Sequence, residues 1–300
     1  MATYHSLDKG WRFREMKEPF FSNAGAHPMG AESPSYDDAD WRLLNLPHDW
    51  SIEGCMAPEP YVMGSNVNIG QNAFLHGGIA WYRRHVDVCD MTHEYLLQID
   101  GSYRQSEVWV NGIYVGGQDN GYFSYALDIT SALHEGDNVI AVRCNNLDTP
   151  NCRWYTGSGL YRHVYLVERH PTHMAHWGVA LTTPRVAADS ALVHLAVELE
   201  GPEGAVEVAT DLLDPQGNLV AHGLCVAALR NGTGLAEMDL TVRQPERWSL
   251  DTPVLYTAQI TLKRDGQAVD SQSTTFGIRS IEYRKGQGFL LNGVPTKFQG

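Results

Sequence analysis

The stretch Glu107-Val-Trp-Val-Asn-Gly-Ile-Tyr-Val115 decides the fold class of this 300-residue chain. The Asn-Gly pair at its centre can adopt positive φ at both turn positions, as a type I′ turn requires. The residues on either side of the pair are β-branched or aromatic, which is typical of strands. The stretch therefore predicts a tight antiparallel hairpin.

Further strand-forming runs lie on both sides of this hairpin. Glu94–Asp100 ends at Gly101, Val139–Cys144 follows a Gly-Asp-Asn turn, and His163–Val167 comes later. Helical periodicity is nearly absent, and Asp128–Leu133 holds one helical turn at most. Together with long loops rich in aromatic residues, these runs predict an antiparallel sandwich of the jelly-roll kind over residues 1–170.

Beyond Pro171 the pattern becomes a strict alternation of apolar and polar residues. It is found in four runs: Leu192–Leu199, Val206–Leu212, Ala236–Val242 and Tyr256–Leu262. A period of two places one face in a core and the other in water. Turn sequences such as Asp214-Pro-Gln-Gly217 and Lys263-Arg-Asp-Gly266 separate the runs, so we expect an immunoglobulin-like sandwich over residues 171–283.

The last residues read as a strand, an Asn292-Gly293 turn and a second strand that stops at Gly300. A domain rarely ends within a hairpin whose second strand is incomplete, so residues 284–300 are expected to begin a further domain. The sequence thus predicts an all-β protein with two sandwich domains and the start of a third.

Composition excludes several functional classes. The formal net charge of −13 argues against nucleic-acid and anionic-membrane surfaces. The sequence contains neither an apolar run long enough to span a membrane nor a recognisable signal peptide at Met1–Ser6. Five scattered cysteines without a CxxC pair predict free thiols in a reducing cytoplasm.

The three histidines of His170-x-x-His173-x-x-His176 invite a reading as metal ligands. They fall in extended backbone, which does not place residues i and i+3 on one face, so we expect neither a metal nor a cofactor.

Several segments carry a resemblance when they are taken in order: Leu46-Pro-His-Asp-Trp50, Gly77-Gly-Ile-Ala-Trp-Tyr-Arg-Arg84, Asp100-Gly-Ser-Tyr103, Val108-Trp-Val-Asn-Gly112, Trp154-Tyr-Thr-Gly-Ser-Gly-Leu-Tyr-Arg162, Trp248-Ser-Leu-Asp-Thr-Pro-Val-Leu-Tyr256, Phe276-Gly-Ile-Arg279 and Phe289-Leu-Leu-Asn-Gly293. The chain resembles the N-terminal half of a glycoside hydrolase family 2 enzyme of the bacterial β-galactosidase type. The resemblance implies a sugar-binding jelly roll, an immunoglobulin-like domain and a (β/α)8 barrel that begins at residues 284–300.

In that family the barrel holds both catalytic glutamates, and this chain ends before them. The resemblance therefore implies a retaining glycosidase that cleaves terminal β-galactosides as the parent protein, and an inactive chain on its own. Retention needs two carboxyls about 5–5.5 Å apart. The carboxylates of this chain lie mostly on the polar faces of strands or in turns, so no catalytic residue is predicted here. A β-glucuronidase or β-mannosidase, or a stand-alone carbohydrate-binding module, are the alternatives.

The loop 145–155 is the first candidate for sugar binding, because it combines amides, a carboxylate, an Arg and aromatic rings outside the strands. Its candidate residues are Asp148, Asn151, Arg153 and Trp154, and either Asp148 or Asn151 matches the family's hydroxyl-binding aspartate. A loop that only packs on the next domain is the alternative.

The long loop 59–76, with Asn66, Asn68, Gln71 and Asn72, is a second candidate edge of the pocket or a non-functional insertion. Trp81 and Trp109 lie inside apolar runs and are expected in the core. The expected partners are a β-galactoside, the missing barrel and further copies of the same chain in a homo-oligomer.

Overall fold

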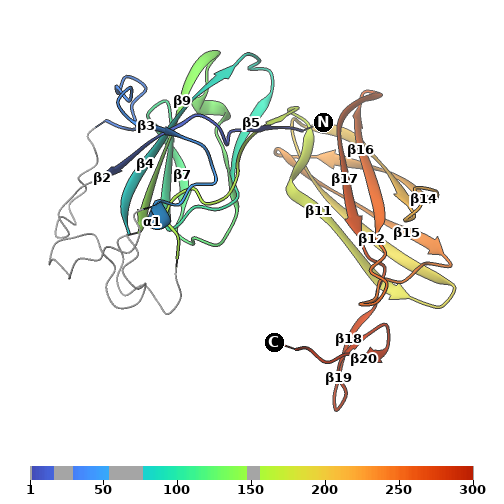
Figure 1. Cartoon of the computed structure of the whole chain (residues 1–300). Helices are drawn as coiled ribbons and strands as arrows, with labels where there is room; N and C mark the ends of the chain where they lie inside the picture. The colour runs from blue at the N-terminus through green and yellow to red at the C-terminus, as the bar shows by residue number, and fades with distance from the viewer. Residues whose placement is uncertain (1, 17–29, 54–76, 147–155, 300) are drawn as a thin grey trace. The chain divides into compact units, whose positions relative to one another are not determined.

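The computed structural model describes residues 2–16, 30–53, 77–146 and 156–299 (Figure 1). Within these ranges the chain is almost entirely β-structure, which confirms the expected fold class. It divides into two compact units, Thr3–Glu168 and Arg169–Gly300, the latter together with Met1–Ala2. None of its described helices is long and apolar enough to cross a membrane.

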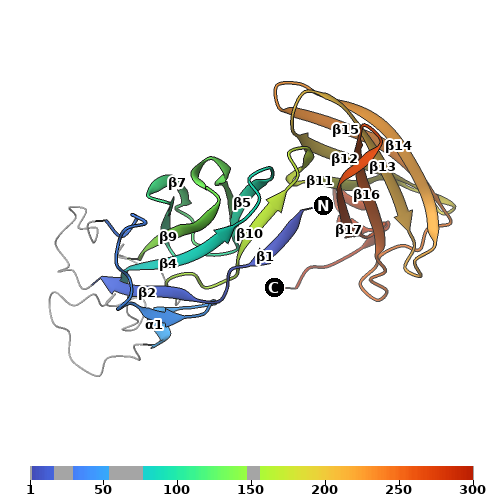
Figure 2. The same cartoon turned by 90° about the horizontal axis from the view of Figure 1, so that it is seen from above.

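The first unit is a jelly-roll sandwich of a six-stranded and a four-stranded sheet. The six-stranded sheet has the order β3-β2-β4-β9-β6-β7, and the other has the order β1-β10-β5-β8, in which β1 runs antiparallel beside β10 (Figure 2). Its elements are β1 (Thr3–Ser6), β2 (Trp11–Met16), β3 (Arg42–Leu44), α1 (Trp50–Glu53), β4 (Gly78–Val88), β5 (Glu94–Ile99), β6 (Gln105–Val110), β7 (Ile113–Gln118), β8 (Tyr125–Asp128), η1 (Thr130–Ala132), β9 (Gly136–Asn146) and β10 (Val164–Arg169).

The core of this unit lies between the two sheets. Its largest fully buried side chains include Trp11, Tyr82, Leu97, Ile140 and Leu160. Burial of an aliphatic or aromatic side chain of this size contributes about 1.5–3 kcal/mol. The core thus joins residues from both sheets and from the Gly-Ser-Gly-Leu segment that precedes β10.

The hairpin at Asn111-Gly112 forms as predicted. Asn111 has φ 51° and Gly112 has φ 83°, and Val110 pairs with Ile113 across the turn. The single helical turn expected within 128–133 is the 3-10 helix η1.

The second unit is the expected sandwich, with sheets in the orders β11-β12-β15 and β14-β13-β16-β17. The alternating residues do face the core: Val193, Leu195 and Val197 are all 0% exposed. Its strands are β11 (His173–Val186), β12 (Ser190–Glu200), β13 (Gly204–Leu213), β14 (Leu219–Leu229), β15 (Thr233–Arg243), β16 (Tyr256–Arg264) and β17 (Gln267–Phe276).

Three short strands follow in the same unit: β18 (Ile281–Arg284), β19 (Gly288–Leu291) and β20 (Val294–Pro295). They form a small antiparallel sheet in this order. Asn292 turns the chain between β19 and β20 with φ 52°, as the Asn-Gly pair predicted. Its side chain also accepts a hydrogen bond from the Ser280 amide (3.0 Å) and donates one to the Trp248 carbonyl (2.9 Å). The Asn-Gly turn therefore fixes this sheet to the chain before it.

Candidate functional site at one end of the jelly roll

Three stretches outside the described residues join the jelly roll at the same end. Met16 pairs with Ile79, Ile79 with Asn145, and Asn145 with Gln105, so the end of β2, the starts of β4 and β6, and the end of β9 lie together. Residues 17–29, 54–76 and 147–155 each begin or end at this edge of the sheet. Loops at one end of a rigid sandwich are a common place for binding residues.

The candidate residues of the sequence analysis fall in these stretches. Asp148, Asn151, Arg153 and Trp154 lie in 147–155, outside the described residues. The second candidate set, Asn66, Asn68, Gln71 and Asn72, lies in 54–76 and is also outside them. The structure does describe the residues that flank both stretches, and these form a connected polar network.

Asp49 is at the centre of this network. Its Oδ1 accepts hydrogen bonds from the amides of Ser51 (2.9 Å) and Ser158 (2.8 Å). The hydroxyls of Ser51 and Ser158 are 2.6 Å apart, and Asn146 donates from Nδ2 to the Ser158 hydroxyl at 2.8 Å. Asn146 and Ser158 flank the stretch 147–155, so this network, which we call the Asp49 clamp, ties its two ends together.

Gly157 has to be a glycine because of the same clamp. A Cβ at this position would lie 2.3 Å from the Asp49 carboxylate. The Asp49 carboxylate and the Gly157-Ser158 segment are therefore fitted to each other, and the His-Asp-Trp and Gly-Ser-Gly motifs meet at this contact. Sequence reasoning used both motifs as marks of resemblance and did not foresee their contact.

His48 extends the network toward α1. Its Nδ1 lies 2.7 Å from the Tyr82 hydroxyl and its Nε2 lies 3.2 Å from Glu53. Burial lowers the pKa of His48 and raises that of Tyr82, so the imidazole is neutral and the phenol protonated. Hydrogen bonds from the Arg42 guanidinium lower the pKa of Glu53 to about 2.

Tyr103 also lies at this end of the jelly roll. Its amide and carbonyl both bond Gly159, at 2.9 and 2.8 Å, and its ring meets Tyr122 edge-on at 5.6 Å. Burial raises the pKa of Tyr103, so its hydroxyl stays protonated. Tyr103 and Tyr122 place aromatic rings beside the flank of 147–155, and sequence reasoning did not identify either ring as part of a site.

The other residues singled out from the sequence have structural partners. His173 contacts the His170 carbonyl (2.8 Å) and Glu200 (2.9 Å), and the His176 ring lies 4.3 Å from the Trp177 ring, tilted by 43°. Within the described ranges there is no group of three His, Cys, Asp or Glu placed to hold a metal. Trp81 is fully buried, as expected, whereas Trp109 is only partly buried.

The fold defines a two-domain β-sandwich protein whose first domain bears these stretches at one end. Comparison with known protein families identifies the class to which the chain belongs. The model described as "Glycosyl hydrolases family 2, sugar binding domain" matches residues 5–170, and "Glycosyl hydrolases family 2" matches residues 177–279. The chain belongs to glycosyl hydrolases family 2.

Individual relatives agree with this assignment. "Beta-galactosidase BoGH2A" of Bacteroides ovatus is 37% identical over 91% of this chain and 32% of its own length. A "Beta-glucuronidase" of Formosa agariphila is 23% identical over 99% of this chain and 32% of its own length. A solved family 2 member from Bacteroides cellulosilyticus superposes with a TM-score of 0.84 at 34% identity, covering 98% of this chain and 37% of that one. The chain thus spans about a third of the length of the curated relatives it matches.

Proposed function

We propose that this chain is the N-terminal, substrate-recognition portion of a retaining glycoside hydrolase that cleaves terminal β-galactosides. The observation that carries the proposal is membership of family 2, together with 37% identity to a protein named a beta-galactosidase. In this proposal Asp148, Asn151 and Arg153 bond sugar hydroxyls, and the ring of Trp154 packs against the C–H face of the sugar.

The Asp49 clamp supports this role for the loop. It fixes Asn146 and Ser158, which flank residues 147–155, to a rigid sheet through four hydrogen-bond contacts of 2.6–2.9 Å. A loop whose ends are held in place loses less conformational entropy when it binds a ligand. A precise binding site requires hydrogen bonds of this kind, which hold the flanks of its loop in place.

Catalysis is proposed to lie outside this chain, in a barrel that residues 284–300 begin. The general acid of a retaining glycosidase needs a raised pKa. The pKa values of three described carboxyls, Glu53, Asp90 and Asp214, are lowered from their ordinary values. Each is stabilised as a carboxylate by hydrogen bonds, which suits a structural anion and does not suit a proton donor.

Activity measurements test whether this chain recognises the substrate while catalysis lies outside it. The 300-residue chain should not hydrolyse a chromogenic β-galactoside, whereas the complete gene product should hydrolyse it with retention. In the complete product, Asp148→Ala, Asn151→Ala or Trp154→Ala should each lower kcat/KM about tenfold or more, because losing a buried polar contact costs about 1–3 kcal/mol. Asp211→Ala, an exposed carboxylate on β13, is the control and should leave kcat/KM unchanged.

Four results would contradict the proposal. Turnover by the isolated chain, after removal of host enzymes, would place catalysis within it. Wild-type kinetics in all three loop variants would show that the loop packs and does not bind. Faster turnover of a β-glucuronide or β-mannoside would move the assignment to those enzymes, and the Formosa agariphila relative makes the glucuronide the first comparison. A complete product that binds sugars but has no turnover would favour a stand-alone binding module.

The compartment is proposed to be the cytoplasm. Cys89, Cys144 and Cys225, the three described cysteines, are all free, and free thiols persist in reducing compartments.

A further inference from the structure

We propose that the outer face of the six-stranded sheet and the segment that follows β7 carry a second carbohydrate-binding groove, for a neutral saccharide, whose lining residues named below lie outside loop 147–155. Two hollows adjoin on this face and share Gln118 and Asp119. One has a volume of about 450 Å³ and the other about 320 Å³. Both lie within the range of about 300–1,000 Å³ that is typical of small-molecule sites.

Aromatic rings stand at both ends of this groove. Tyr114 borders the larger hollow and is 57% exposed, and Tyr122 borders the smaller one and is 54% exposed. Tyr114 is held edge-on against Trp109 at 5.6 Å, and Trp109 in turn lies 5.1 Å from the buried Trp81. Tyr122 is held similarly by Tyr103. Rings that are fixed in place and still exposed can receive the C–H faces of pyranose rings at little entropic cost.

A β-bulge shapes the wall that carries Tyr114. The register passes from Val108↔Gly116 to Trp109↔Tyr114, so Val115 is the extra residue on the edge strand β7. Bulges at sheet edges often re-aim a side chain beside a binding site. Gly117 follows on the same wall, and a Cβ there would lie 2.0 Å from the Ser106 carbonyl oxygen, so the close approach of β7 to β6 requires glycine.

Between the rings the groove is polar but balanced in charge. Arg143 forms an ion pair with Glu107, and both residues line the larger hollow. Asp119 adds a second carboxylate, and Arg104 in the smaller hollow adds a second guanidinium. Gln105 and Gln118 supply amides that both donate and accept hydrogen bonds. Two positive and two negative groups favour an uncharged ligand with many hydroxyls over a uronic acid or a phosphate.

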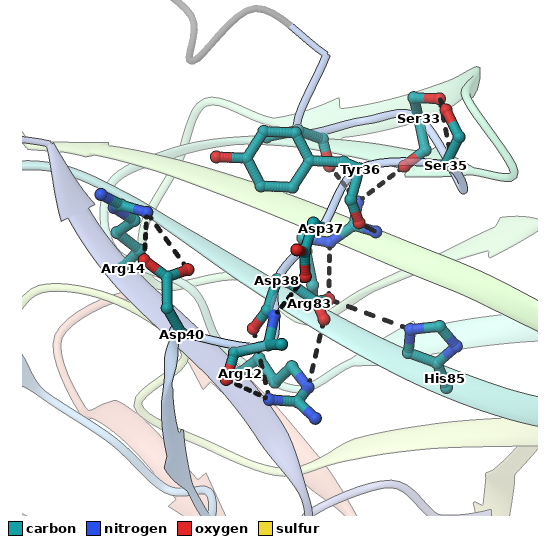
Figure 3. Close-up of polar contacts among 12 residues, drawn as sticks. Arg12, Arg14, Ser33, Ser35, Tyr36, Asp37, Asp38, Asp40, Arg83 and His85 are labelled. Carbon is teal, nitrogen blue, oxygen red and sulfur yellow. Dashed lines mark hydrogen bonds and ion pairs between the residues drawn. The ribbon is translucent and has the colours of Figure 1, made fainter.

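Segment 30–41 covers the part of the same sheet face that carries Trp81, which sets the limit of the groove. Figure 3 shows Arg83 beneath the segment 30–41, where it binds Asp38 at 2.8 Å and the carbonyls of Ala31 and Ser33. This segment packs Trp41 into a buried cluster with Trp81. The face is therefore covered at Trp81 and open at Tyr114.

An NMR titration of the 300-residue chain tests the proposal. Lactose and cellobiose are the neutral probes, and methyl β-glucuronide is the charged one. A neutral probe should shift the backbone amides of Tyr114, Gln118 and Asp119, with millimolar affinity. Tyr114→Ala and Gln118→Ala should each weaken binding by about tenfold, the loss expected for one ring or amide contact. The matched control is Tyr4→Ala on the other sheet, since Tyr4 is 53% exposed and also meets a tyrosine ring edge-on.

Several outcomes would overturn the proposal. No response to either neutral probe would make the groove an ordinary polar surface. Equal affinity in wild type and both groove variants, with their amide spectra otherwise unchanged, would place the sugar elsewhere. Stronger binding of the glucuronide would contradict the charge argument. Shifts confined to amides of residues 147–155 would support the proposed function and reject the second groove, so the two inferences fail separately.

Discussion

Arg83 shows how a single buried charge positions a whole segment. Its side chain is 0% exposed, and it satisfies Asp38 and several backbone carbonyls of the segment 30–41 (Figure 3). Nothing in the sequence distinguishes Arg83 from Arg84, because both follow Trp-Tyr in a strand. A buried guanidinium is recognisable only when its partners, about 50 residues earlier in the chain, are seen around it.

The first prediction concerns this residue. Arg83→Met should destabilise the jelly roll by about 3 kcal/mol, the lower end of the range for breaking a buried pair, because Arg12 still contacts Asp38 at 3.2 Å. Arg14→Met is the control: its pair with Asp40 is exposed and should contribute about 0–1 kcal/mol. Hydrogen exchange at the Trp41 and Trp81 amides reports the local loss of stability. Equal effects of the two variants would show that Arg83 does not anchor the segment.

The second prediction is the response of the Asp49 end to acid. The folded pKa of Glu53 is lowered from 4.5 to about 2, so its contribution to stability is present above pH 4.5 and is lost as pH falls toward 2. The folded pKa of His48 is lowered from 6.5 by burial, so its protonation at lower pH also favours unfolding. Both groups therefore make this end less stable in acid.

Amide protection factors of His48 and Ser158, measured from neutral pH to about pH 3, should fall in the wild type. Glu53→Gln should make the acid part of this decline shallower, and Glu237→Gln on β15 should not change it. A decline of the same steepness in Glu53→Gln would mean that other groups control the acid response.

At the scale of elements, three turns show what the sequence predicts well. The pairs Asn111-Gly112, Asp265-Gly266 and Asn292-Gly293 all take positive φ at both residues, and each joins two antiparallel strands. The chemistry of such turns is local, so two residues suffice to identify them. Strict alternation in the second unit is equally local, because each strand faces one core.

The first unit was harder to predict for a physical reason. Its strands β2 and β4 mix buried aromatic residues with arginines, since the outer sheet face is itself covered at Trp81 by segment 30–41. A sheet covered on both faces loses the period of two. The same holds for the site: the composition of loop 145–155 suggested sugar binding, whereas the clamp of Asp49 with Ser158 spans more than 100 residues and leaves no local pattern.

The third prediction concerns the element that ends the described chain. Asn292→Ala should release the β18–β20 sheet from Trp248, because it removes two side-chain hydrogen bonds of about 0.5–1.5 kcal/mol each and adds the left-handed penalty of about 1–2 kcal/mol. Asn231→Ala is the matched control, since Asn231 has the same φ of 52° in an exposed turn.

Limited proteolysis and hydrogen exchange over residues 281–295 provide the measurement. Asn292→Ala should raise cleavage and exchange there while β12 keeps its protection, and Asn292→Asp, which retains the acceptor for Ser280, should have a smaller effect. Equal exchange in Asn292→Ala and wild type would show that the sheet is held by other contacts.

At the scale of the molecule, the two units carry different kinds of surface. The jelly roll combines the Asp49 clamp with the polar groove beside Tyr114. The second unit adds a small sheet with exposed apolar side chains beyond its sandwich: Ile281 is 54% exposed, Tyr283 78%, Val294 63% and Phe298 69%. In a family whose curated relatives are about three times as long as this chain, such a surface is suited to burial against another part of a protein.

The last prediction follows from that surface. The 300-residue chain should self-associate in solution, because apolar patches of this kind drive association and β18 and β20 are the outer strands of their sheet. The net charge of −13 opposes association, so the effect should strengthen as salt screens the charge. Tyr283→Lys should shift sedimentation toward the monomer, whereas Leu224→Lys, at an apolar site 57% exposed on β14, should not. A wild-type monomer at high concentration and high salt would show that this sheet needs no partner, and would favour a self-sufficient binding module over a portion of a larger enzyme.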